Sequence, residues 1–265
     1  MKKLIVANWK MTPQTLKEAR NLFTDTVKAG KKIRNAKVVV CAPFIWISAL
    51  AGSAKSKVAL GAQDVFWEDP PAGGGSYTGE VSVKMLKSAG VQYVIIGHSE
   101  RRRPPAGGGE TDEIINKKIK RAVANNLKVI FCVGEFERDE AGNYFQFIKD
   151  EIKKGLKDIS SRFLKNLIVV YEPVWAISRV NRSGKARFNA DNPEDALEMA
   201  TYIKRVLVSI FGKSARRVPV LYGGSVDPGN AGDFLEKGNV DGLLVGRTSW
   251  NGKTFDELLR NISKI

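Results

Sequence analysis

The sequence predicts an α/β protein folded as a single (β/α)8 barrel, because eight short apolar runs recur along it and helical patterns separate them. Runs that are apolar throughout are typical of parallel strands buried on both faces of a sheet. Regular alternation with helices indicates βα units. Eight such units in 265 residues close most simply into a barrel, although an open doubly wound sheet shares the same local pattern. We expect one domain over residues 1–265.

The predicted strands follow from the positions of the apolar runs. They lie at Leu4–Ala7, Lys37–Cys41, Val58–Gly61, Tyr93–Gly97, Lys128–Val133, Leu167–Tyr171, Val218–Tyr222 and Gly242–Val245. Between them, apolar residues recur at helical spacing, as at Ile115, Ile119 and Ala122. Two of these helices are predicted to begin at Thr111–Glu113 and at Asp191–Glu194. Each run supplies an N-cap side chain and early negative charge, and the second adds a proline suited to the first helical turn.

The composition is strongly basic, with 43 Lys and Arg against 28 Asp and Glu and a formal net charge of +15. A basic surface attracts anions of any size, from nucleic acid to a phosphorylated metabolite. The cations are spread along predicted helices, for example at 117–121 and 149–157. No zinc-ligand spacing, phosphate-binding P-loop or aromatic and basic RNA motif accompanies them. We therefore interpret the charge as a solvated surface and expect no nucleic-acid partner.

The N-terminal residues and the two cysteines indicate the cellular compartment. The apolar run after Lys3 is too short for a secretory signal or a membrane span, so we expect a cytoplasmic protein without a membrane partner. Cys41 and Cys132 both lie in apolar, strand-like runs. We expect them to be buried, reduced thiols.

One hexapeptide, Pro-Pro-Ala-Gly-Gly-Gly, occurs twice, at 70–75 and at 104–109. Neither copy can join the interior of a helix or a sheet, because proline followed by a glycine run gives a stiff entry into a flexible segment. We expect two exposed loops, after the third and the fourth strand.

Polar residues follow several of the predicted strands at the point where each strand ends. Lys10 follows the first, His98 the fourth and Glu172 the sixth, and glycine-containing turns at 223–224 and 246 follow the last two. In a barrel of parallel strands these ends converge on one face. Taken singly, a lone histidine or lysine is more often structural, and glycine turns are ordinary. Together they predict a base, an imidazole and an ammonium group facing one small anion, with backbone N–H groups available for a phosphate.

Several segments at these strand ends resemble the signature segments of the triosephosphate isomerase family, in the family's order. They are Ala7–Met11, Gly97–Arg102, Tyr171–Ile177 and Tyr222–Val226. Further matching segments extend the resemblance over essentially the whole chain. The resemblance implies a TIM barrel that acts as an isomerase of glycolysis and gluconeogenesis. It would interconvert dihydroxyacetone phosphate and D-glyceraldehyde 3-phosphate through an enediolate, without a metal or organic cofactor.

The resemblance also implies roles for individual residues. Glu172 would take the proton from one carbon and return it to the next, while His98 polarises the carbonyl as a neutral imidazole, an arrangement already established for this family. Lys10 would balance the negative charge of the substrate, and Asn8 would help to position its oxygens. Glu100 matches a supporting acidic position.

Four residues match the positions that hold the substrate phosphate in the family: Ser178, Ser225, Gly246 and Arg247. Family members often have glycine where Arg247 stands. The amide of Arg247 can still donate a hydrogen bond, but only if the backbone angle there tolerates a Cβ.

The chain departs from the family pattern after Ile177, where the family has a short lid containing glycine. Residues 178–192 form a longer and strongly basic segment, with 183–185 as a shifted counterpart of the second hinge, whereas the first hinge at 173–175 is intact. Altered hinges change kcat and KM together. We expect activity that persists but is reduced or gated differently. The alternatives are a catalytically impaired scaffold or anion-binding protein, and a different sugar-phosphate isomerase or lyase on the same fold.

The loop that carries Thr78 reaches into the neighbouring subunit in the family, which implies a homodimer. The insertions at 70–75 and 104–109 then either meet at the dimer contact or are simply solvent-exposed.

Overall fold

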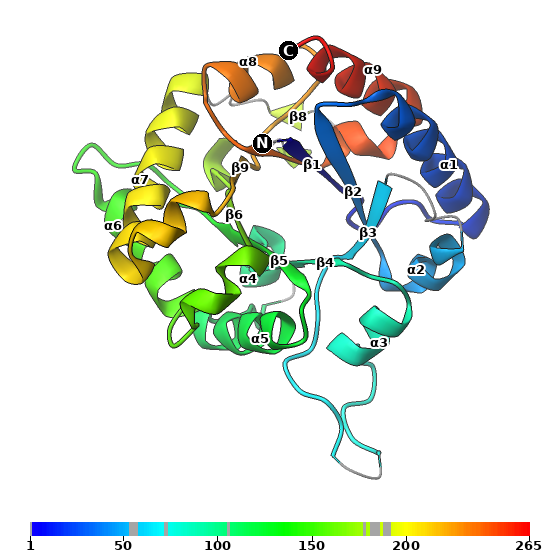
Figure 1. The fold of residues 1–265 in the computed structure, drawn as a ribbon, viewed down its shortest axis with the longest axis horizontal. Coiled ribbons are helices and arrows are strands. Elements are labelled where there is room, and N and C mark those ends of the chain that lie inside the picture. Colours follow the sequence, from blue (N-terminus) through cyan, green and yellow to red (C-terminus); the bar gives the residue numbers. More distant parts are fainter. Residues whose placement is uncertain are drawn as a thin grey trace.

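The prediction of a (β/α)8 barrel is confirmed by a computed structural model in which eight parallel strands form a closed barrel. Around the barrel the strands follow the order β1, β10, β9, β6, β5, β4, β3, β2. The helices surround them as a ring (Figure 1). The structure describes residues 2–52, 58–71, 74–104, 107–176, 179–180, 186–187 and 192–265.

The barrel strands match the eight predicted runs to within two residues at each end. They are β1 (Lys3–Asn8), β2 (Ala36–Ala42), β3 (Val58–Ala62), β4 (Tyr93–Ile96), β5 (Lys128–Val133), β6 (Leu167–Tyr171), β9 (Val220–Tyr222) and β10 (Gly242–Val245). β4 ends before Gly97, whose positive φ of 76° turns the chain out of the strand. β9 begins after Pro219, which has no N–H to donate to a neighbouring strand.

A short antiparallel pair, β7 (Arg179–Val180) and β8 (Ala186–Arg187), lies within the segment predicted as a lid. The sequence does not predict this pair. Two residues on each side are too few to show the alternating pattern from which a strand is recognised.

The helices fall between the strands, with single 3-10 turns between some of them. The helices are α1 (Leu16–Lys32), α2 (Phe44–Ala51), α3 (Val83–Ser88), α4 (Ser99–Arg102), α5 (Asp112–Ala124), α6 (Asn143–Gly155), α7 (Pro193–Phe211), α8 (Ala231–Glu236) and α9 (Gly252–Ile262), and the 3-10 turns are η1 (Ser161–Asn166), η2 (Val174–Ala176), η3 (Lys213–Arg217) and η4 (Arg247–Trp250). Both predicted N-caps are present. The Thr111 side chain accepts from the Ile114 N–H at 3.4 Å, and Asn192 accepts from the Asp195 N–H at 2.7 Å.

The core has two layers. Apolar side chains on one face of the strands fill the barrel interior, among them Val6, Val39, Ile130 and Leu244. Those on the other face pack against the surrounding helices. Cys41 and Cys132 belong to the interior layer and are buried free thiols, and burial raises the pKa of both. The prediction that both are buried is therefore confirmed.

Both copies of the repeated hexapeptide follow the strands predicted for them. The copy at 70–75 lies in the connection from β3 to α3, which projects from the barrel (Figure 1). The copy at 104–109 follows α4. Their described residues lie outside helices and strands, as expected. In the part of the chain that the structure describes, no helix is both long and apolar enough to cross a lipid bilayer.

The barrel closes where β1 pairs with β10, with Leu4 opposite Gly242. A Cβ on Gly242 would lie 2.0 Å from the Leu4 carbonyl oxygen, so the first and last strands approach closely only because this residue is glycine. We predict that Gly242→Ala lowers the free energy of unfolding by about 3 kcal/mol, at the upper end of overpacking effects. Gly232→Ala is the matched control, because a Cβ there meets nothing within 4 Å, and it should raise stability by about 0.5 kcal/mol as a helical glycine replacement. Urea unfolding followed by circular dichroism measures both.

Candidate active site

A cavity of about 360 Å³ lies at the carboxyl ends of the barrel strands. Its lining includes most of the residues singled out from the sequence: Asn8, Lys10, His98, Glu172, Ser225, Gly246 and Arg247. Glu100 lies at the rim, with its side chain 59% exposed. Ser178 and most of the predicted lid lie outside the described residues. Strand ends that are far apart in the sequence therefore meet at one hollow.

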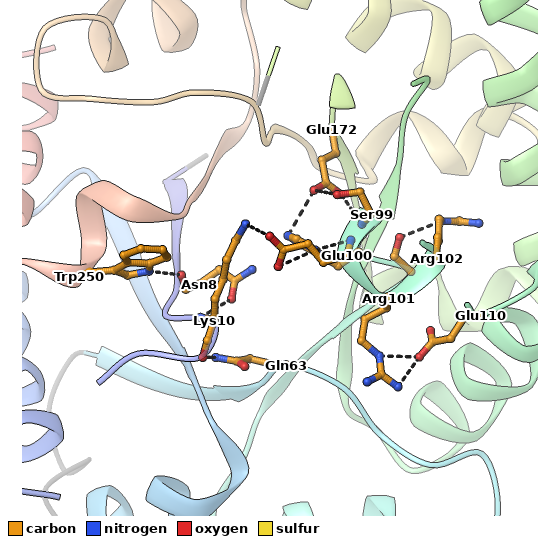
Figure 2. A network of polar contacts seen from close by, with 12 residues as sticks. Asn8, Lys10, Gln63, Ser99, Glu100, Arg101, Arg102, Glu110, Glu172 and Trp250 are labelled. Atoms are coloured by element: carbon orange, nitrogen blue, oxygen red, sulfur yellow. Dashed lines mark hydrogen bonds and ion pairs between the residues drawn. The ribbon is translucent and has the colours of Figure 1, made fainter. Parts of the chain in front are cut away.

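Glu172 follows β6 directly, and only 2% of its surface is exposed. The Ser99 N–H donates to Glu172 Oε2 at 3.0 Å, and the Ser99 hydroxyl donates to Oε1 at 2.7 Å (Figure 2). A buried carboxylate requires such donors, since an unpaired charge away from water is costly. The two bonds hold the carboxylate in one orientation beside the cavity.

His98 caps the N-terminus of α4 and is 6% exposed. Its Nδ1 accepts from the Glu100 N–H at 3.2 Å, and its Nε2 lies 3.2 Å from Glu172 Oε1. A nitrogen that accepts a hydrogen bond carries no proton, so the ring proton belongs on Nε2. The imidazole therefore presents a donor to the cavity beside the carboxylate.

Lys10 follows β1 with a backbone φ of 51°, in the left-handed region that residues with a Cβ rarely adopt. Its N–H donates to Asn8 Oδ1 at 3.1 Å, and its carbonyl accepts from Gln63 Nε2 at 2.9 Å. The ammonium group lies 2.6 Å from Glu100 Oε1 (Figure 2). Hydrogen bonds on both sides of the residue thus hold the strained turn that directs Lys10 to the cavity.

The other side of the cavity is formed by the turns after β9 and β10. Gly246 precedes η4, and Arg247 does not have a positive φ, so its backbone tolerates a side chain. The Trp250 indole N–H at the end of η4 donates to the Asn8 carbonyl at 3.1 Å. The Ser225 hydroxyl donates to the Ala176 carbonyl at 2.8 Å, which joins the turn after β9 to the base of the predicted lid.

Two residues of the site were not assigned a role from the sequence. In the sequence Ser99 is only one member of a matching segment, yet its backbone N–H and its hydroxyl donate to the two carboxylate oxygens of Glu172. Glu135 is 1% exposed, and its Oε1 accepts from the Tyr171 hydroxyl and the Trp175 indole N–H, each at 2.8 Å. It therefore anchors the first hinge of the lid. It stands two residues after β5, so the sequence signal that could have found it is a carboxylate close to a strand end.

The structure shows no group that could hold a metal ion among its described residues, judged by clusters of three or more His, Cys, Asp or Glu side chains.

Comparison with known proteins gives one consistent result. A family model described as triosephosphate isomerase matches residues 3–262. The chain is 41% identical to the triosephosphate isomerase of Moorella thermoacetica, covering 95% of both chains, and 40% identical to that of Carboxydothermus hydrogenoformans, covering 98% of both. The crystal structure of triosephosphate isomerase from Bartonella henselae superposes with a TM-score of 0.80 at 29% identity, covering 99% of each chain.

Proposed function

Because this chain belongs to the triosephosphate isomerase family, we propose that its cavity interconverts dihydroxyacetone phosphate and D-glyceraldehyde 3-phosphate, with Glu172 as the base. The observation that carries the proposal is the meeting of a buried carboxylate and an imidazole donor, 3.2 Å apart, in a cavity that Lys10 also lines. An aldose–ketose isomerisation needs these groups: a base, a donor for the carbonyl and a positive charge.

The proton transfer belongs to Glu172. Its carboxylate takes a proton from the carbon beside the carbonyl and returns it to the neighbouring carbon, so no net change in protonation results. In the described state Ser99 holds both carboxylate oxygens. Glu172 must therefore leave Ser99 when the substrate binds, and the short hydrogen bonds are exchanged for contact with the reacting carbon.

The developing enediolate is stabilised by His98 and Lys10. The Nε2–H of His98 donates to the substrate oxygen, because its Nδ1 is occupied by the Glu100 N–H. The Lys10 ammonium supplies positive charge at the same oxygen and exchanges its contact with Glu100 for the substrate. Asn8 lines the same side of the cavity and positions the substrate oxygens.

The phosphate lies at the opposite side of the cavity. We assign it to the Ser225 side of the turn after β9 and to the N–H groups of Gly246 and Arg247, with Ser178 as the contribution of the lid. Arg247 also lines the cavity, and its side chain adds a positive charge to this side of the molecule. It increases the attraction for a dianionic phosphate before the lid acts.

We further propose that the chain works as a homodimer in the cytoplasm. The projecting connection from β3 to α3 carries Thr78. Its Tyr77 is 41% exposed, although the Tyr77 ring packs on Phe66 at 4.8 Å between ring centroids. A projection that is held by this aromatic contact and exposes part of an aromatic residue suits insertion into a second subunit.

Replacing the base tests the proposal most directly. Glu172→Gln keeps the shape of the side chain but removes its basicity, so kcat should fall by about 10² to 10⁴-fold. The measurement is a coupled spectrophotometric assay that starts from glyceraldehyde 3-phosphate. Equal turnover by the parent and the variant contradicts the assignment. A parent chain with no turnover at all favours the impaired scaffold.

Removing the extra cation tests the phosphate side. Arg247→Gly should raise KM about fivefold and leave kcat nearly unchanged, because the charge attracts the ground state and the transition state equally. The inhibition constant of inorganic phosphate should rise by a similar factor. Arg217→Gly is the matched control, since it removes the same charge from an exposed residue before β9, at the other end of the barrel. A KM equal to that of the control contradicts the role of Arg247.

Light scattering at micromolar concentration tests the dimer. We expect a particle of twice the 29.2 kDa chain mass. Deleting residues 72–77 should shift the mass toward that of one chain, whereas deleting 105–108 should not. A parent chain that scatters as a monomer contradicts the proposal.

A further inference from the structure

A buried ion pair, Arg102 with Glu151, lies behind the two reacting side chains. Arg102 Nη1 is 3.1 Å from Glu151 Oε1, and the two side chains are 10% and 5% exposed. Neither residue lines the cavity. Buried charges of this kind are costly to bury and do not by themselves stabilise a fold, so the pair calls for another explanation.

Arg102 joins two adjacent strands at their carboxyl ends. Its Nε donates to the Gly97 carbonyl at 2.8 Å, just after β4, and its Nη2 donates to the Cys132 carbonyl at 3.3 Å, in β5. Figure 2 shows the contact of Arg102 with a backbone oxygen of this segment. Since Gly97 immediately precedes His98, the guanidinium fixes the backbone from which the imidazole projects.

Glu151 extends the same contact to the base. Its Oε2 accepts from the Gly134 N–H at 2.9 Å. Gly134 packs so tightly on the backbone of Glu172 that a Cβ there would lie 1.9 Å from the Glu172 carbonyl oxygen. Any movement of Gly134 is therefore passed on to the backbone of Glu172.

We propose that Arg102 and Glu151 are positioning residues that hold the ends of β4 and β5 together and thereby set the separation between His98 and Glu172. The proposal rests on the assignment of His98 and Glu172 to the reaction. A shift of about 1 Å between reacting groups can cost about 10²-fold in rate, so a clamp behind them has a direct effect on turnover.

The charges around Glu151 make the clamp sensitive to pH. Burial raises the pKa of Glu151 to about 7, against the lowering effects of Arg102 and the Gly134 N–H, and Asp112 and Glu172 raise it further. Asp112 in turn contacts Arg102 at 2.7 Å and Lys154 at 3.6 Å. Below neutral pH Glu151 takes a proton, and Arg102 then keeps Asp112 as its negative partner but loses the charge of Glu151.

The test compares Glu151→Gln with Asp150→Asn, the matched control that removes one carboxylate from the adjacent position of α6. Glu151→Gln should lower kcat at pH 8 by about 10-fold to 100-fold. KM and the inhibition constant of inorganic phosphate should stay within about twofold, because the phosphate side lies at β9 and β10. Asp150→Asn should match the parent in all three quantities.

The pH dependence gives a second readout. As the pH is lowered and Glu151 is protonated, the kcat of the parent should fall, with an inflection near pH 7. Glu151→Gln should lack this inflection. The folded state binds the Glu151 proton more tightly than the unfolded state, whose pKa is near the ordinary 4.5. The parent should therefore lose stability relative to Glu151→Gln as the pH rises from about 5 to 8.

Three results overturn the proposal. The first is a kcat of Glu151→Gln equal to that of the control with an unchanged pH profile. The second is phosphate binding weakened as much as kcat, which indicates general disorder. The third is an unchanged kcat of Arg102→Lys. One ammonium group cannot contact both carbonyls and Glu151, so this variant should lose as much kcat as Glu151→Gln. It tests the clamp even if Glu151→Gln does not fold. Glu172→Gln in the same assay distinguishes a failure of the clamp from a failure of the proposed function, because undiminished turnover of this variant refutes the proposed function itself.

Discussion

Closure of the barrel is the constraint on which the rest of the structure depends. The pairing of β1 with β10 makes the two ends of the chain neighbours and places Lys10 beside the turn that carries Gly246. The indole of Trp250 then bonds to the Asn8 carbonyl across this junction. Without closure, the charge of Lys10 after β1 and the turn at Gly246 after β10 would lie at opposite edges of an open sheet. The cavity therefore depends first on the closed order of the strands, which brings its side chains together.

Within that frame, the polar groups of the site hold one another in place before any substrate arrives. Ser99 orients Glu172, the Glu100 N–H fixes the tautomer of His98, and Glu100 itself contacts Lys10. All three contacts come from the short segment that begins α4. A site organised in this way loses little free energy to reorganisation when charge develops on the substrate. The four residues of α4, shortly after β4, supply these contacts at the carboxyl end of the strand.

The sequence predicted the strands and the members of the site because both leave local signals. An apolar run identifies β6, and a carboxylate directly after it identifies Glu172 as unusual. The clamp has no such signal: Arg102 and Glu151 are 49 positions apart, in α4 and α6, and only the folded barrel brings them together. The role of Ser99 could not be predicted for a different reason, because a serine beside a histidine is compatible with many ordinary helix starts.

The repeated hexapeptide shows that identical sequence can meet different physical demands. In the first copy, Gly75 has a φ of 86° and open space around its Cα, so glycine serves the backbone angle alone. In the second, a Cβ on Gly109 would lie 1.8 Å from the Arg102 carbonyl oxygen, so glycine serves close packing. The Glu110 N–H then bonds to the Arg101 carbonyl at 2.9 Å and returns the chain to α4. The second copy therefore ends against the backbone of α4, at Arg101 and Arg102.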